Sequence, residues 1–477
     1  MADIRCPLHE AARISRDAPA LRWADDELTY YEFDRYVSGA AQRLHAAGLR
    51  AGDRIGLLES GSWQSIVSFF GVLRLGAVVC PLSRRLPPAA VASHLAHVDA
   101  AALLAEEEVP GLALRQLSIG ETARSAGRPA PDIECLRPAL DRDATVVFTS
   151  GSSGTPKAVL HTHGNHYYSA LGSNHNVRIR SKQTWMLSVP ISHVSGIGIL
   201  YRCLLGGASV LLPKRGVDLA DSLSEQKPTH LSVVPTQLLR LLRHGAPCES
   251  LKTLVVGGGP IPQEWIEQAV RHRWPIFCTY GLTEMASQVT TEPIGQPISR
   301  RGTAGALLRH RELRIGDDDE ILVRGQTLFK GYIEGDTLRR PLDRDGWFAT
   351  GDLGALDDEG LLTVTGRKDT QFVSGGENIH PEAIEDALAA LDGVGQSLVV
   401  PVPHPEYGQR PVAFVQLRDP SADLASLAER LRQRLPGFMV PDHFFPWPDD
   451  LDTGLKTQRR PFTERAVALL RSHPGEP

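Results

Sequence analysis

The stretch that decides the fold runs from Thr145 to Lys157 and reads Thr-Val-Val-Phe-Thr-Ser-Gly-Ser-Ser-Gly-Thr-Pro-Lys. It opens with a β-branched run that predicts a buried strand, and it continues into a loop rich in glycine and hydroxyl groups. Gly151 and Gly154 let the main chain turn and approach an anion closely, and the Lys157 ammonium adds a positive charge. The hydroxyls that can donate to phosphate oxygens are those of Thr149, Ser150, Ser152, Ser153 and Thr155. The stretch therefore predicts a phosphate-binding loop at the end of a strand.

Two better-known nucleotide motifs do not fit this chain. A Walker A loop requires GxxxxGK followed by Ser or Thr, whereas here the glycines are spaced GxxG and Pro156 precedes the lysine. The glycines at 257–259 follow a strand but do not continue as GxGxxG, so a dinucleotide fold is not supported. A flexible Ser/Gly connector is the remaining alternative for the loop, and linkers rarely follow a buried strand directly.

Short β-branched runs alternate with helical stretches on both sides of the loop. These runs lie at 145–148, 209–212, 231–234 and 253–256, and such alternation predicts parallel sheets covered by helices. Between about 300 and 367 the pattern changes to paired short strands, for example Glu312 to Ile315 with Glu320 to Val323, which predicts an antiparallel sheet or barrel. After Arg367 another stretch of mixed elements begins, with Pro381 as the first residue of a helix.

These patterns predict an α/β protein of two domains. We expect residues 1–367 to form a large N-terminal domain of two parallel-sheet α/β subdomains plus a small antiparallel β-barrel. Residues 368–477 are expected to form a small mobile α+β C-terminal domain. The length of 477 residues accommodates several such units.

Composition excludes several function classes. The net charge is −5 and the 51 basic residues are scattered, so no nucleic-acid footprint is indicated. The N-terminus lacks the apolar run of a secretory signal, and no stretch favours membrane insertion, so we expect a cytoplasmic protein. Six cysteines without a CxxC pair fit reduced thiols. His161, His163 and His166 have no acidic or thiol ligand at metal-binding spacing, so we interpret them as structural.

Five further segments accompany the loop, and the set resembles the adenylate-forming superfamily of acyl-CoA synthetases, adenylation domains and luciferases. The segments occur in the superfamily's order between about residues 145 and 460. They are Tyr280–Glu284 (YGLTE), Gly346–Asp352 (GWFATGD), Gly366–Asp369 (GRKD), Ser374–Glu382 (SGGENIHPE) and Thr453–Lys456 (TGLK). The resemblance implies an enzyme that uses ATP and Mg²⁺ to adenylate a carboxylic acid, with coenzyme A as co-substrate.

The resemblance also assigns roles that suit the residue types. The Tyr280 ring suits stacking on a purine, and the Glu284 carboxylate is a hard oxygen ligand for Mg²⁺. Thr283 is expected at the α-phosphate, where it serves as a catalytic residue. Asp352 can accept hydrogen bonds from both ribose hydroxyls, with Arg367 assisting. The implied nucleotide-binding set is Thr149, Ser150, Gly151, Ser152, Ser153, Gly154, Lys157, Gly258, Gly259, Tyr280, Thr283, Asp352, Arg367 and Lys456.

Two further positions follow from the superfamily's two half-reactions. Lys456 matches the C-terminal catalytic lysine, a cation that adenylation needs where charge develops at the α-phosphate. Its motif lacks the usual preceding Pro-Arg and has only Leu455 between glycine and lysine. Asp369 matches the hinge about which relatives rotate the C-terminal domain, which would bring Gly375 and Gly376 to the channel for coenzyme A.

The stretch Ser188 to Arg202 is expected to form the acyl pocket, with His193 as a catalytic gate residue. No aspartate stands in Pro190 to Arg202, which disfavours an amino-acid substrate because an ammonium group would need one. Arg202 follows Ser195 by seven residues, so both face the same side of a helix, and a cation there implies a second carboxylate on the substrate. The expected substrate-binding set is His193, Ser195, Arg202, Thr236, Gly257 and Gly281.

The strings HVSGIGILYR and LSVVPTQLLR resemble most closely the ligases that join 2-succinylbenzoate to coenzyme A in menaquinone biosynthesis. In this resemblance Ser195 and Arg202 contact the acid, and Thr236 lines the pocket wall. Three alternatives stay open, namely an aryl or medium-chain acyl-CoA synthetase, a standalone module that loads a carrier-protein thiol, and a noncatalytic nucleotide-binding protein. A homo-oligomer is also possible.

Overall fold

The computed structural model describes residues 4–124, 137–149, 156–293, 303–375, 377–418, 423–424, 426–451 and 457–472. The first sheet has eight strands, and the predicted phosphate loop follows one of its central strands. In spatial order they are β19 (Thr337–Arg339), β18 (Gly331–Glu334), β8 (Lys157–Thr162), β7 (Asp143–Thr149), β4 (Val78–Ser83), β3 (Arg54–Glu59), β5 (Ala102–Ala105) and β6 (Gln116–Ser118). Strands β7 to β6 pair in parallel, while β19, β18 and β8 pair antiparallel.

The second sheet has thirteen strands and unites the predicted parallel subdomain with the predicted antiparallel region. In spatial order they are β16 (Arg311–Ile315), β17 (Glu320–Gly325), β20 (Phe348–Leu356), β21 (Leu361–Arg367), β15 (Gly305–Leu307), β14 (Ser287–Thr291), β13 (Ile276–Leu282), β12 (Thr253–Val256), β11 (His230–Val233), β9 (Thr184–Met186), β10 (Ser209–Leu212), β1 (Pro19–Trp23) and β2 (Asp26–Thr29). Strand β13 pairs in parallel with β12 and antiparallel with β14, so it joins the two regions.

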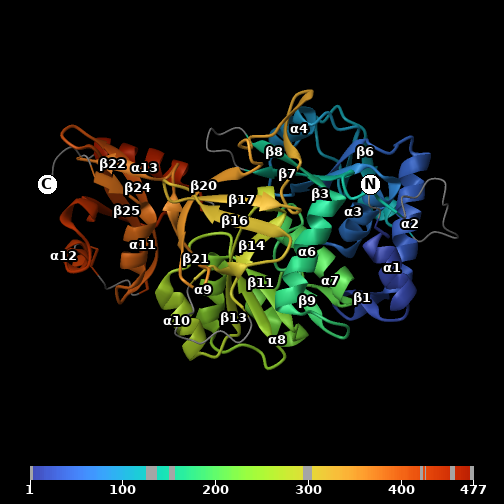
Figure 1. Ribbon diagram of the computed structural model, residues 1–477, viewed down its shortest axis with the longest axis horizontal. Helices are drawn as coiled ribbons and strands as arrows, with labels where there is room; N and C mark the ends of the chain where they lie inside the picture. The colour runs from blue at the N-terminus through green and yellow to red at the C-terminus, as the bar shows by residue number, and fades with distance from the viewer. Residues whose placement is uncertain are drawn as a thin grey trace.

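The helices of the N-terminal part bury their apolar faces between and against these sheets (Figure 1). They are α1 (Pro7–Ile14), α2 (Tyr30–Ala46), α3 (Trp63–Leu75), α4 (Pro88–His97), α5 (Ile119–Thr122), α6 (His163–Val177), α7 (Val194–Gly206), α8 (Leu219–Gln226), α9 (Pro235–His244) and α10 (Gln263–Arg271). Helix α2 begins at a capping box between Thr29 and Glu32, and Gly48 follows its end with φ +86°.

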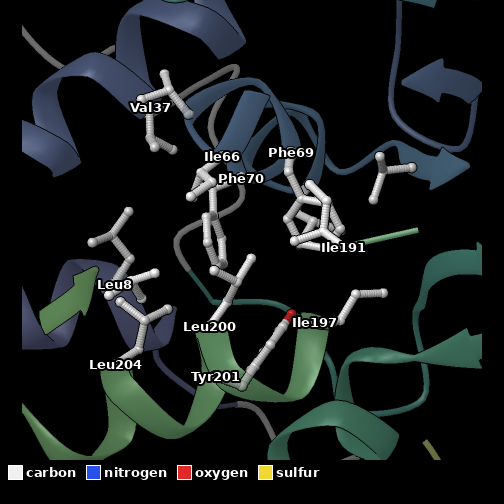
Figure 2. Packing of buried hydrophobic residues seen from close by; sticks show 14 of the residues in the cluster. Leu8, Val37, Ile66, Phe69, Phe70, Ile191, Ile197, Leu200, Tyr201 and Leu204 are labelled. Atoms are coloured by element: carbon white, nitrogen blue, oxygen red, sulfur yellow. The ribbon is translucent and has the colours of Figure 1, made fainter. Parts of the chain in front are cut away.

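One large hydrophobic cluster joins the two sheets. Figure 2 shows Leu8 of α1, Val37 of α2 and Phe70 of α3 facing Leu200 and Tyr201 of α7. Helix α3 follows a strand of the first sheet, whereas α7 precedes a strand of the second. The shared core therefore fixes the position of the two sheets relative to each other, and with it the position of the loops at their edges.

The third sheet belongs to the C-terminal part of the chain and lies at one end of the molecule (Figure 1). Its strands are β23 (Glu377–Ile379), β22 (Phe372–Ser374), β25 (Gly408–Leu417), β24 (Val394–His404) and β26 (His443–Pro446), with helices α11 (Pro381–Ala389), α12 (Ser426–Arg432) and α13 (Arg459–Ser472). Hydrophobic clusters cover both faces of this sheet. The mixed α/β fold with a smaller C-terminal α+β part is confirmed, while the domain boundary at Lys368 stays a prediction.

Among the described helices, none is both long and apolar enough to cross a membrane. The cysteines that the structure describes, Cys6, Cys80, Cys203, Cys248 and Cys278, are free thiols, and Cys135 lies outside the described residues.

The three predicted structural histidines are buried, and His161 and His166 make side-chain hydrogen bonds within the core. His166 Nε2 lies 2.8 Å from the Thr145 hydroxyl, and His161 Nε2 lies 2.7 Å from the Thr283 carbonyl oxygen. Burial lowers the pKa of His161 and His163 to about 4, so both rings are neutral at pH 7. Within the part of the chain that the structure describes, no group of three or more His, Cys, Asp or Glu residues is arranged to hold a metal ion.

The buried histidines predict a measurable dependence of stability on pH. The pKa of His163 is about 4 in the folded protein and 6.5 is its ordinary value, so the unfolded chain binds more protons between these limits. His163 therefore stabilises the fold fully above pH 6.5, and this contribution is lost as pH falls toward 4. We expect the difference in unfolding free energy between wild type and His163→Gln to shrink by on the order of 1–3 kcal/mol from pH 7 to pH 4.5 in urea titrations. A difference in unfolding free energy that stays constant between pH 7 and pH 4.5 would contradict this role of His163.

Candidate active site

The predicted phosphate loop lies between β7 and β8 in the sequence. Thr149 and Lys157, which flank it, are register partners across these antiparallel strands. Ser150, Gly151, Ser152, Ser153, Gly154 and Thr155 lie outside the described residues. The Lys157 ammonium lies 5.3 Å from the centre of the Tyr332 ring on β18. The loop's lysine is thus placed beside a strand that the sequence motifs do not include.

Tyr332 connects this lysine to the turn that bears Thr283 and Glu284. The turn is the short 3₁₀ helix η1 (Thr283–Met285), which follows β13 directly. The Tyr332 hydroxyl donates to Glu284 Oε1 at 2.6 Å, and the Phe329 amide donates to the Glu284 carbonyl at 2.7 Å. Burial and the adjacent carboxylate raise the pKa of Tyr332, so the hydroxyl remains a donor.

This arrangement fits the chemistry of a bound Mg²⁺ ion. Among the described residues, no donor contacts the other oxygen of Glu284, Oε2. A single protein carboxylate suffices for Mg²⁺ where substrate phosphates and water supply the remaining ligands. The Glu284 carboxylate, which Tyr332 connects to Lys157, therefore suits a magnesium–nucleotide complex.

A second group of predicted residues meets where β13, β20 and β21 lie close together. The Tyr280 hydroxyl donates to Asp352 Oδ2 at 2.6 Å, and Arg367 Nη1 donates to Asp352 Oδ1 at 2.9 Å. Asp352 and Arg367 are register partners on β20 and β21, and Tyr280 and Asp352 are buried. The structure thus brings together three residues separated by up to 87 positions (367 − 280).

The same arginine contacts the predicted hinge. Arg367 Nε donates to Asp369 Oδ1 at 2.8 Å, and Arg367 Nη2 donates to Asp369 Oδ2 at 3.2 Å. These carboxylates raise the pKa of Arg367 against the effect of its burial. The adjacent Lys368 ammonium lies 2.5 Å from Asp318 Oδ2 and from Glu320 Oε2. One guanidinium therefore links the Tyr280–Asp352 pair to the residue about which rotation is expected.

The predicted glycine loop lies at the carboxyl ends of the parallel strands, the edge at which ligands bind in such sheets. A Cβ at Gly257 would lie 2.6 Å from Thr279 Cγ2, so only glycine fits between β12 and β13. Gly258 has φ +87°, and Gly259 faces Pro235. Thr236 follows at the start of α9, and Gly281 packs against β14.

Helix α7 carries the predicted acyl-pocket residues. His193 is its N-cap and is exposed, and Ser195 is half-buried in the first turn. Arg202 is 2% exposed and donates through Nη2 to the Ser287 hydroxyl at 3.1 Å. Ser287 is four residues beyond Thr283, so the guanidinium lies near the turn that carries Glu284.

The surroundings of Arg202 suit an anionic ligand. Its Nε atom is buried without a hydrogen-bond partner among the described residues, and no described carboxylate forms an ion pair with it. Burial lowers the pKa of Arg202 to about 10. Arg311, the neighbouring buried arginine, is instead held by the carbonyls of Ser169, Gln288 and Arg309. Burying a guanidinium whose N–H donor makes no hydrogen bond costs free energy, unless a bound anion accepts a hydrogen bond from that donor.

The last predicted catalytic residue, Lys456, lies outside the described residues, as does the rest of 452–456. The described chain resumes at Thr457, and Arg459 begins α13. Arg459 Nη2 lies 2.9 Å from Glu382 Oε1 on α11, and Arg459 also pairs with Glu385. The segment that follows Lys456 is therefore tied to the helix that follows the Gly375 turn.

Sequence reasoning missed Tyr332 and Ser287, which orient Glu284 and Arg202. Tyr332 lies in no quoted motif, and the only available signal was its position in a short strand near the Gly346–Asp352 segment. Ser287 lies three residues beyond Glu284, the end of the YGLTE string, and its contact with a residue 85 positions earlier could not be predicted from spacing.

Comparisons with known proteins agree with this geometry. Residues 8–333 match the family described as AMP-binding enzyme, and residues 383–453 match the AMP-binding enzyme C-terminal domain. A 2-succinylbenzoate–CoA ligase of Salmonella typhimurium is 35% identical over 463 residues, which are 95% of this chain and 96% of the relative.

Two solved structures of MenE, the o-succinylbenzoate CoA synthetase of Bacillus subtilis, are also similar. One is in complex with the acyl-adenylate intermediate OSB-AMP, with a TM-score of 0.87 at 28% identity, and the match covers 96% of this chain and 97% of that one. The other is in complex with ATP and magnesium ion, with a TM-score of 0.86 at 28% identity over 96% and 98% of the two chains.

Proposed function

Because this chain belongs to the AMP-binding enzyme family, we propose that it is an AMP-forming acid–CoA ligase that converts 2-succinylbenzoate to 2-succinylbenzoyl-CoA. ATP, Mg²⁺ and coenzyme A are its co-substrates and cofactor. The observation that carries the choice of acid is Arg202, a buried cation with an unused donor beside the predicted adenylation site. A cytoplasmic location and the oligomeric state stay predictions.

In the first half-reaction the substrate carboxylate attacks the α-phosphorus of ATP. A carboxylate oxygen–phosphorus bond forms, the bond to the β-phosphate bridging oxygen breaks, and pyrophosphate leaves. We propose that the 149–157 loop binds the phosphates, that Asp352 and Arg367 hold the ribose, and that Tyr280 stacks on the adenine. Gly258 and Gly259 would line that side of the nucleotide.

The groups around the α-phosphate would stabilise the charge that develops there. Thr283 donates to a phosphate oxygen and Lys456 supplies a cation in this proposal. Glu284 would hold Mg²⁺, which neutralises phosphate charge when bound. The hydrogen bond from Tyr332 fixes the orientation of the Glu284 carboxylate before the nucleotide arrives.

In the second half-reaction the coenzyme A thiolate attacks the acyl carbon, a carbon–sulfur bond forms and AMP leaves with the electrons of the carbon–oxygen bond. Rotation about Asp369 would withdraw Lys456 and bring the Gly375 turn to the coenzyme A channel, while His193 would be the gate residue of the acyl pocket. The acid would lie among Ser195, Arg202, Thr236, Gly257 and Gly281, with its second carboxylate on Arg202.

Pyrophosphate release across a panel of acids tests this function. With ATP and Mg²⁺, we expect the largest kcat/KM with 2-succinylbenzoate and much smaller values with benzoate and octanoate. Addition of coenzyme A alone should then produce the thioester and AMP with saturation. Preference for benzoate or octanoate would favour the aryl or medium-chain alternative, and dependence on a carrier protein would favour the loading module.

A further inference from the structure

Strand β8 carries Lys157 and His161 on one face, and His161 contacts the turn η1. Residues 157, 159 and 161 share one face of the strand because side chains alternate. Lys157 at its start contacts the Tyr332 ring, Val159 lies in the same hydrophobic cluster as Tyr280 and Met285, and His161 reaches the Thr283 carbonyl. The strand that leaves the phosphate loop is therefore also the strand that contacts the turn carrying Thr283 and Glu284.

The hydrogen bond between His161 and Thr283 fixes the protonation of the ring. A carbonyl oxygen can only accept, so Nε2 of His161 carries the proton and donates across 2.7 Å. Nδ1 is then an acceptor, and the Thr145 hydroxyl lies 3.4 Å from it. Because the ring is 0% exposed and neutral, the donor is held in one direction.

Among the described residues, the other hydrogen bonds of the turn go to elements other than β8. The Phe329 amide donates to the Glu284 carbonyl, and the Ser169 hydroxyl donates to the Ala286 carbonyl at 2.9 Å. The Thr283 carbonyl accepts from the Ala286 amide within the turn as well as from His161. Loss of the imidazole would therefore remove the direct hydrogen bond between the turn and the phosphate-loop strand, while the link through Tyr332 and the packing of Val159 in the cluster of Met285 would remain.

We propose that His161 is a positioning residue for adenylation, which holds Thr283 and Glu284 in a fixed position relative to strand β8. The inference rests on the proposed function for the roles of those two side chains. Groups that orient residues in contact with metal or substrate typically contribute 10- to 100-fold to activity or affinity, because a displacement of about 1 Å misplaces the reacting atoms.

Two substitutions separate positioning from packing. His161→Leu removes the donor while filling most of the space, and His161→Gln can place an amide N–H near the same carbonyl. His230→Leu is the matched control, since His230 is equally buried, has its pKa lowered to about 4, and lies at the amino end of β11, opposite the candidate site. All are compared with wild type by urea midpoint and by kinetics of pyrophosphate release.

We expect His161→Leu to lower kcat for pyrophosphate release by about 10- to 100-fold with a smaller change in KM for ATP, and His161→Gln to recover most of the loss. His230→Leu should lower the urea midpoint by a similar amount with kcat near wild type. The proposal would be overturned if His161→Leu slowed release no more than His230→Leu, or if Gln and Leu at 161 were equally slow.

A readout without turnover distinguishes failure of this inference from failure of the proposed function. Calorimetry measures how much Mg²⁺ strengthens binding of a non-hydrolysable ATP analogue, with no acid present. We expect the logarithm of this Mg²⁺-induced gain in affinity to be at most half as large in His161→Leu as in wild type. His230→Leu should retain the full gain. An unchanged magnesium effect would count against His161 whichever acid the enzyme activates, whereas a wild-type panel that excludes 2-succinylbenzoate would count only against the proposed acid.

Discussion

Replacement of Arg202 by alanine is expected to lower kcat/KM for 2-succinylbenzoate on the order of 10- to 100-fold. Charge-assisted hydrogen bonds contribute about 1.5 to 3 kcal/mol, and each 1.4 kcal/mol corresponds to a factor of about ten. The guanidinium is buried, donates to Ser287 and has an unused Nε donor, so a ligand carboxylate would gain a partner already in place. The measurement is pyrophosphate release at varied acid concentration.

The substitution should act on one class of acid. A monocarboxylate such as benzoate has no group to meet Arg202, so its kcat/KM is expected to change by less than about threefold. Arg202→Lys keeps the charge without the planar fork and should fall between alanine and wild type. An equal loss on both acids, with the urea midpoint unchanged, would mean that Arg202 does not contact the second carboxylate.

Replacement of Lys456 by alanine is expected to slow acid-dependent pyrophosphate release on the order of 10²- to 10³-fold, the usual effect of removing one preorganised donor from a charged transition state. The second half-reaction should be nearly unaffected, because the proposed rotation removes this lysine from the site. Thioester formation from preformed acyl-adenylate and coenzyme A measures it separately.

A surface lysine provides the control for that experiment. Lys214 pairs with Glu225 at 2.6 Å and lies outside the candidate site, so Lys214→Ala should leave both half-reactions at wild-type rates. If Lys456→Ala released pyrophosphate normally, the catalytic assignment carried by the TGLK string would be wrong, and the departures of that string from the superfamily pattern would be the reason.

Local sequence patterns were sufficient to predict most elements of the fold. The β-branched runs at 209–212 and 253–256 coincide with β10 and β12, and Pro381 begins α11 as expected. Spacing could not predict that the antiparallel strands continue the second sheet, because this depends on β13 pairing differently on its two sides. Pairing between distant strands is a property of the assembled chain and leaves little local signal.

Several residues of the candidate site could also be predicted from the sequence, whereas the contacts between them could not. Motif strings identified Tyr280, Asp352 and Arg367, and the structure brings them within hydrogen-bonding distance. The contacts that orient them were not predictable, since His161 reaches Thr283 across 122 positions and was interpreted only as a core histidine. Nor could sequence show that Arg202 has no carboxylate partner among the described residues, because that depends on every neighbouring element at once.

The guanidinium of Arg367 serves Asp352 with one nitrogen and Asp369 with the other two. In the roles proposed for Asp352 and Asp369, ribose binding and rotation of the C-terminal part would therefore be energetically coupled through Arg367. A substitution on either carboxylate redistributes the same cation, so effects measured singly at the two positions should fail to add in a double-mutant cycle. If the proposed roles hold, a substitution that loosens the hinge at Asp369 would also change the affinity for the nucleotide.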